Sequence, residues 1–155
     1  MSAYKNILIT KKAETCHISL NKPKKLNALS SDTLKEISKA CGEIALNKKI
    51  KIVVFSSTSM NFSAGADLRE ANQNKTVEDH WHENTGRRCI NSIINLPQIS
   101  ICLIEGFCLG GGAVIATACD FRIAETNSLF GYPEIELGMN SVSYTHLRAH
   151  ETAVN

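Results

Sequence analysis

Two glycine-rich segments occur where buried strands are expected to end and helices to begin. They are residues 62–68, Phe-Ser-Ala-Gly-Ala-Asp-Leu, and residues 106–112, Gly-Phe-Cys-Leu-Gly-Gly-Gly. Small residues let a backbone approach a ligand closely, and free N–H groups at a helix start attract negative charge. If the two segments converge, their N–H groups can stabilise one developing oxyanion. The alternative is that each glycine group only makes a tight turn, and the spacing alone leaves both interpretations open.

Nucleotide-binding motifs are absent from the second segment. Gly110 to Gly112 is not followed by Lys and then Ser or Thr, so the segment is not a P-loop. A dinucleotide fingerprint needs Gly or Ala at position 115, which is Ile115. The glycines therefore do not indicate nucleotide binding, and the oxyanion and tight-turn interpretations both remain open.

Length, charge and hydropathy exclude several classes of protein. The chain has 155 residues, which predicts one domain, and a formal net charge of +2. Without clustered surplus positive charge we expect no nucleic-acid partner. No apolar run approaches the roughly 20 residues that a membrane span needs, and residues 1–5 lack the apolar region of a secretory signal. We therefore expect a cytoplasmic protein with no membrane partner.

The cysteines and histidines give no clear metal site. Six cysteines occur without Cys-x-x-Cys spacing, and we expect them to be small hydrophobic residues of the core. His80 and His82 would face apart on a helix. His146 and His150 have a metal-binding spacing but lie in an atypical C-terminal segment. We predict no metal.

Hydrophobic periodicity predicts alternating strands and helices. A hairpin is expected at residues 7–10 and 15–20, followed by an amphipathic helix from caps at residues 30–32 to about residue 47. A second helix should begin at Thr76 and end before Pro97, and residues 113–119 read as a buried helix. Further strands are expected at residues 51–56, 99–104 and 120–124. The order predicts an α/β fold with a largely parallel sheet covered by helices.

Four segments in chain order resemble the enoyl-CoA hydratase/isomerase (crotonase) family. They are residues 23–29, 62–68, 110–120 and 130–134. The resemblance implies a spiral of ββα units followed by a C-terminal helical region. It also implies an acyl-CoA thioester substrate, so that coenzyme A is part of the substrate and no separate cofactor is needed. Full-length relatives are expected to form homotrimers or hexamers.

The resemblance also assigns the binding residues. The family pattern places the two oxyanion amides at Ala64 and Gly111. From its residue type we expect Asp67 to cap a helix and to orient the first loop rather than to do chemistry. The residues that would lie along the substrate and its coenzyme A are Lys24, Lys25, Leu26, Ala28, Ala64, Gly65, Ala66, Asp67, Leu68, Gly110 and Gly111.

The family's catalytic carboxylates carry over only in part. Hydratases of the family hold water between two glutamates, and the first of these positions is Val114 here, whereas the second is Glu134. A single carboxylate can take a proton from one carbon and return it to another, so isomerase-type proton transfer is favoured. Apolar neighbours at residues 130, 132 and 135 would raise the pKa of Glu134 by desolvation. Hydration or another crotonase-type lyase reaction is the alternative, and Glu134 as a solvated turn residue is the alternative without function.

The last fifteen residues depart from the family pattern. Residues 141–155 continue no apolar period and resemble translated sequencing-adapter read-through. We predict a crotonase-like core at residues 1–140, a non-native tail at residues 141–155, and a missing C-terminal helical region. A catalytically silent acyl-CoA-binding fragment is therefore a second hypothesis.

Overall fold

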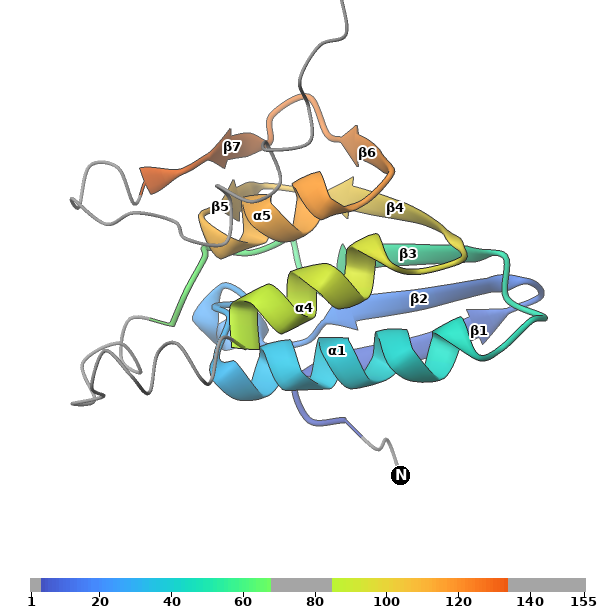
Figure 1. The fold of residues 1–155 in the computed structure, drawn as a ribbon. Helices are drawn as coiled ribbons and strands as arrows, with labels where there is room; N and C mark the ends of the chain where they lie inside the picture. Colours follow the sequence, from blue (N-terminus) through green and yellow to red (C-terminus); the bar gives the residue numbers. More distant parts are fainter. Residues whose placement is uncertain (1–3, 68–84, 134–155) are drawn as a thin grey trace, which may run out of the picture.

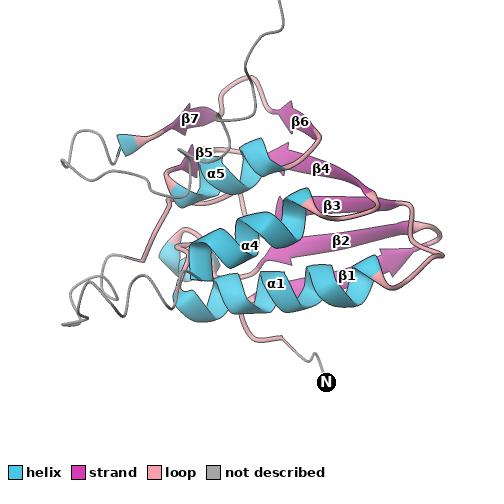
Figure 2. Ribbon diagram, in the orientation of Figure 1, coloured by secondary structure: helices cyan, strands magenta, loops and turns pink. Residues whose placement is uncertain are grey.

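The computed structural model describes residues 4–67 and 85–133. In this part of the chain, a five-stranded sheet has three α-helices lying across one of its faces (Figure 1). A second, two-stranded sheet lies beside helix α5, Gly111–Ala118 (Figure 2). The expected α/β architecture with a helix-covered sheet is confirmed.

The five-stranded sheet is parallel except at one edge. Its strand order is β1-β2-β3-β4-β6, with β1 antiparallel to β2 and every other neighbouring pair parallel. The predicted N-terminal hairpin and the largely parallel sheet are thus confirmed. The strands are β1 Ile7–Lys12, β2 Thr15–Leu20, β3 Ile52–Ser57, β4 Ile99–Ile104 and β6 Phe121–Ala124.

The described helices are α1 Ser31–Ala45, α4 Thr85–Ile94 and α5 Gly111–Ala118. The predicted cap of α1 is confirmed, because Ser30 Oγ accepts a hydrogen bond from Thr33 N–H at 3.3 Å. Helix α4 ends before Pro97 as expected, whereas the predicted helix start at Thr76 lies outside the described residues.

The core lies between the helices and the sheet. It includes Ile37 of α1, Val53 of β3, Ile93 of α4 and Ile115 of α5, each at most 1% exposed. All six cysteines are free and buried, as predicted. Burial raises the pKa of the Cys108 thiol to about 12, so this thiol is protonated at neutral pH.

The region after β4 differs from the sequence-based expectation. Residues 107–109 belong to the second glycine-rich segment, where the sequence predicts no strand, but they form β5, Phe107–Leu109, which pairs in parallel with β7, Leu129–Gly131. Cys108 is fully buried at the centre of β5, and Leu129 N–H donates to Gly106 O at 2.9 Å. Three residues show too little periodicity for a prediction, and the pairing depends on a partner about twenty residues away.

No helix within residues 4–67 and 85–133 combines the length and the apolar content that crossing a membrane requires.

Candidate active site

Residues 26–29 and 64–67 run side by side in the part of the fold where we expect the active site. Leu29 N–H donates to Gly65 O at 2.8 Å, and Asp67 N–H donates to Leu29 O at 3.0 Å. The two segments form an isolated parallel bridge between Leu29 and Ala66. Two of the regions that sequence analysis assigned to substrate binding are therefore adjacent.

The loop before α5 joins the same assembly through Ser63. Ser63 N–H donates to Phe107 O at 2.8 Å, and Leu109 N–H donates to Ser63 O at 2.9 Å. The backbones are so close that a Cβ on Gly65 would lie 3.1 Å from Leu109 O. A Cβ on Gly112 would lie only 2.7 Å from Ser63 Cβ. The two glycine-rich segments therefore converge, which turns alone would not require.

Helix α5 presents free backbone donors at its start. Gly110 precedes the helix with a left-handed φ of 50°, and its carbonyl accepts from Val114 N–H at 3.0 Å. Gly111 is the first helical residue, so its N–H has no acceptor within the helix. Among the described residues, no hydrogen bond from this N–H is formed. The Gly111 amide is thus available to a ligand.

The predicted role of the Ala64 amide is wrong. Ala64 N–H donates to Leu26 O at 3.0 Å, so it holds the two segments together and is not available to a substrate. Gly65 adopts a left-handed φ of 96°, which turns the chain between Ala64 and Ala66. Regular extended backbone would not make this turn, and a side chain at position 65 would resist it.

The Ala66 amide points the opposite way. In a trans peptide the C=O and N–H bonds are antiparallel. Because Gly65 O faces Leu29 N–H, the Ala66 N–H of the same peptide is directed away from residues 26–29. No acceptor for it occurs within the described parts of the chain. Ala66, rather than Ala64, therefore supplies the first segment's available donor.

A buried polar network supports these loops, and sequence analysis missed it. Asn27, 2% exposed and in a left-handed conformation with φ 53°, donates through Nδ2 to Asn61 O at 2.8 Å. Its Oδ1 accepts from Lys22 N–H at 2.8 Å. The fully buried Ser63 hydroxyl donates to Asn27 O at 2.9 Å and accepts from Gly65 N–H at 3.1 Å. An asparagine between Leu26 and Ala28 was the available signal, since Asn tolerates left-handed backbone.

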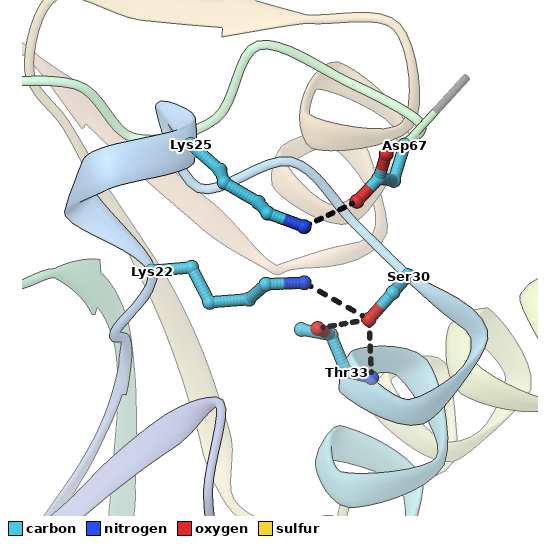
Figure 3. A network of polar contacts seen from close by, with 5 residues as sticks. All are labelled: Lys22, Lys25, Ser30, Thr33 and Asp67. Carbon is cyan, nitrogen blue, oxygen red and sulfur yellow. Dashed lines mark hydrogen bonds and ion pairs between the residues drawn. The ribbon is translucent and has the colours of Figure 1, made fainter. Parts of the chain in front are cut away.

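Two lysines flank the site, Lys25 in the short 3₁₀ turn η1, Pro23–Lys25, and Lys22 directly before it. Lys25 Nζ lies 3.5 Å from Asp67 Oδ2, and Lys22 Nζ donates to Ser30 Oγ at 3.1 Å (Figure 3). Both side chains are directed toward the start of α1 and the end of the first glycine-rich segment (Figure 3). Together with Lys24 they give this rim positive charge, and residues 21–25 line a shallow groove. The Asp67 side chain pairs with Lys25, and its predicted role in capping a helix and orienting the loop stays a prediction.

Position 114 carries no acid. Val114 is 3% exposed and lies in the first turn of α5, close to the Gly111 amide in sequence. The predicted acid/base Glu134 and the predicted contact Leu68 lie outside the described residues. Within the described ranges, no three His, Cys, Asp or Glu side chains come together as a metal site.

A model of the family described as enoyl-CoA hydratase/isomerase matches residues 10–152. The chain belongs to this family. Short-chain-enoyl-CoA hydratase of Clostridium acetobutylicum is 37% identical over 135 residues, which are 86% of this chain and 52% of that protein. Crotonyl-CoA hydratase of Syntrophomonas wolfei is 34% identical over 138 residues, 88% of this chain and 53% of that protein.

Solved structures agree on the fold. The enoyl-CoA hydratase of Bacillus anthracis superposes with a TM-score of 0.83 at 30% identity, over 90% of this chain and 55% of that one. The crotonase-like fold predicted from the four segments is therefore confirmed. The chain spans about half the length of the curated relatives it matches. The boundary at residue 140 stays a prediction.

Proposed function

We propose that the protein acts on acyl-CoA thioesters and stabilises an enolate between the backbone N–H groups of Ala66 and Gly111. The observation that carries this proposal is the convergence of two glycine-rich loops, each with one N–H that has no acceptor among the described residues. Such fixed donors stabilise charge that develops on a carbonyl oxygen without reorganising during the reaction. Membership of the enoyl-CoA hydratase/isomerase family supports the same chemistry.

The lysine rim is the proposed site for the coenzyme A phosphates. Lys22 and Lys25 are held by Ser30 and Asp67, so their charges are already ordered before a ligand arrives. Ordered cations lose less conformational freedom on binding than mobile ones. The groove is lined by residues 21–25, and the residues that follow in the chain, 26–29, lie against the proposed oxyanion loop.

Isomerase-type proton transfer is the favoured reaction. The Glu134 carboxylate takes a proton from C2 of a 3-enoyl thioester, and the electron pair shifts toward the thioester oxygen held by the two amides. The same proton then returns at C4, which moves the double bond to C2 and leaves the carboxylate as it began. Buried, apolar Val114 supports this reaction, because it cannot hydrogen-bond an attacking water.

Hydration of a 2-enoyl thioester is the second candidate. The names of the matched relatives, short-chain-enoyl-CoA hydratase and crotonyl-CoA hydratase, favour it. In that reaction Glu134 alone would activate water, and the isopropyl side chain of Val114 would form one wall of the water site.

Assembly into a trimer or hexamer and a cytoplasmic location stay predictions.

Optical assays with a 2-enoyl-CoA and a 3-enoyl-CoA test these proposals. Conversion of the 3-enoyl thioester at a rate well above hydration of the 2-enoyl thioester supports isomerisation by one carboxylate. Equal rates with native Val114 would contradict the single-carboxylate proposal. Binding of both thioesters with no turnover would instead identify a silent acyl-CoA-binding protein.

A further inference from the structure

The two peptides that flank the Gly65 Cα, Ala64–Gly65 and Gly65–Ala66, are each restrained by a hydrogen bond. Gly65 O accepts from Leu29 N–H at 2.8 Å, and Gly65 N–H donates to Ser63 Oγ at 3.1 Å. At a φ of 96°, glycine backbone has few local preferences that would fix this geometry. The bond from Leu29 holds the Gly65–Ala66 peptide itself, and the bond to Ser63 Oγ holds the peptide before it, so the two bonds together define the turn at Gly65 that precedes the Ala66 N–H.

The Ser63 hydroxyl can serve Gly65 because its own proton is engaged elsewhere. It donates to Asn27 O at 2.9 Å, which leaves a lone pair facing Gly65 N–H. Asn27 is in turn fixed by Lys22 N–H and Asn61 O, both at 2.8 Å. Ser63 is fully buried, so no water replaces the hydroxyl if it is lost.

We propose that Ser63 is a positioning residue, whose hydroxyl, oriented by Asn27, holds the Ala64–Gly65 peptide and so completes the turn at Gly65 that directs the Ala66 N–H toward the thioester oxygen. The inference rests on the proposed enolate function and extends it to a side chain that touches no substrate. Removing the hydroxyl leaves Gly65 with one restraint and one unpaired buried N–H. The turn at Gly65 is then held from the Leu29 side alone, so the Ala66 donor is directed less precisely, while the coenzyme A rim is unchanged.

Ser100, near the start of β4, is a matched control for Ser63. Ser100 is 2% exposed, and its Oγ donates to Asp120 Oδ2 at 2.7 Å and accepts from Asp120 N–H at 2.9 Å. Ser63 and Ser100 are thus both buried serines with one donated and one accepted hydrogen bond. Only Ser63 adjoins the glycine-rich loops, so Ser100→Ala reports the cost of losing such a serine away from the site.

The experiment compares wild type, Ser63→Ala, Ser63→Cys and Ser100→Ala. The probe is an aryl-substituted 2-enoyl-CoA, whose conjugated absorption moves to longer wavelength when its thioester oxygen accepts hydrogen bonds. A coenzyme A thioether without the carbonyl oxygen serves as the binding reference. We expect Ser63→Ala to lose most of the wavelength shift and about tenfold to a hundredfold in turnover, as a misplaced reacting group does. Affinity for the thioether should stay unchanged, and Ser100→Ala should keep the full shift.

Each outcome separates the two proposals. A wild-type protein that binds the probe without any wavelength shift contradicts the proposed oxyanion site itself. A wild-type shift that Ser63→Ala retains in full overturns the positioning role of Ser63. Should Ser63→Ala fail to fold, Ser63→Cys decides on the same spectrum, because it keeps the volume but accepts hydrogen bonds weakly.

Discussion

Replacing Gly112 with alanine should separate the two loops of the site. The new Cβ would lie 2.7 Å from Ser63 Cβ and 3.3 Å from Ser63 O. Carbon atoms in van der Waals contact are about 3.5–4.0 Å apart, so the start of α5 must move by about 1 Å. Because Ser63 is fully buried and bonded on both sides of its backbone, the helix is the part that moves.

The expected cost has two components. Overpacking of this kind destabilises a protein by about 1–3 kcal/mol, and the higher helix propensity of alanine offsets up to about 1 kcal/mol of that. The difference lies between about 0 and 3 kcal/mol, and from the middle of this range we expect a net loss of about 1–2 kcal/mol and a fall in melting temperature of about 2–8 °C. A displacement of about 1 Å at the Gly111 donor should lower turnover by about a hundredfold.

Gly42→Ala is the control for the same substitution. Gly42 is exposed within α1, and a Cβ there meets no atom within 4 Å. This variant should be more stable than wild type by about 0.5–1 kcal/mol, with unchanged turnover. Urea unfolding and the wavelength shift of a bound aryl-enoyl-CoA measure both effects. A Gly112→Ala protein with wild-type stability and a full wavelength shift would refute the close packing of α5 against Ser63.

Three further predictions concern Asp120, the six cysteines and position 114. Hydrogen bonds from Ser100 lower the pKa of Asp120, so the charged carboxylate stabilises the fold above the unfolded-state pKa, and this stabilisation is lost as pH falls through the lower folded-state pKa. Urea unfolding from pH 5 down to pH 2 should therefore show a steeper loss for wild type than for Asp120→Asn. A thiol reagent should label none of the six buried cysteines in the native protein and all six in urea, and labelling without denaturant would contradict their burial. Val114→Glu should raise 2-enoyl-CoA hydration relative to isomerisation at some cost in stability, since a carboxylate is then buried, and an unchanged ratio in the two optical assays would exclude position 114 as a determinant of the reaction.

Periodicity was sufficient for the main sheet and helices. The apolar run that became β3 and the fully apolar stretch that became α5 are long enough to show their period, and both form where expected. Strands β5 and β7 are three residues each. They pair with each other, and β5 also pairs with Ser63, which is distant in sequence. Such pairing is decided by tertiary contact and leaves no local pattern.

The wrong choice of Ala64 as an oxyanion donor has a similar cause, since it too depends on tertiary contacts. Ala64 and Ala66 are the same residue type on either side of Gly65, so composition and spacing cannot distinguish their amides. What distinguishes them is Leu26 O, which accepts from Ala64 N–H, and Leu29 N–H, which fixes the Gly65 carbonyl and turns the Ala66 N–H the other way. Both partners come from a segment about forty residues earlier, where Leu26 and Asn27 adopt left-handed φ values of 49° and 53°. The direction of the donor therefore depends on how residues 26–29 are bent, and the buried contacts of Asn27 hold that bend.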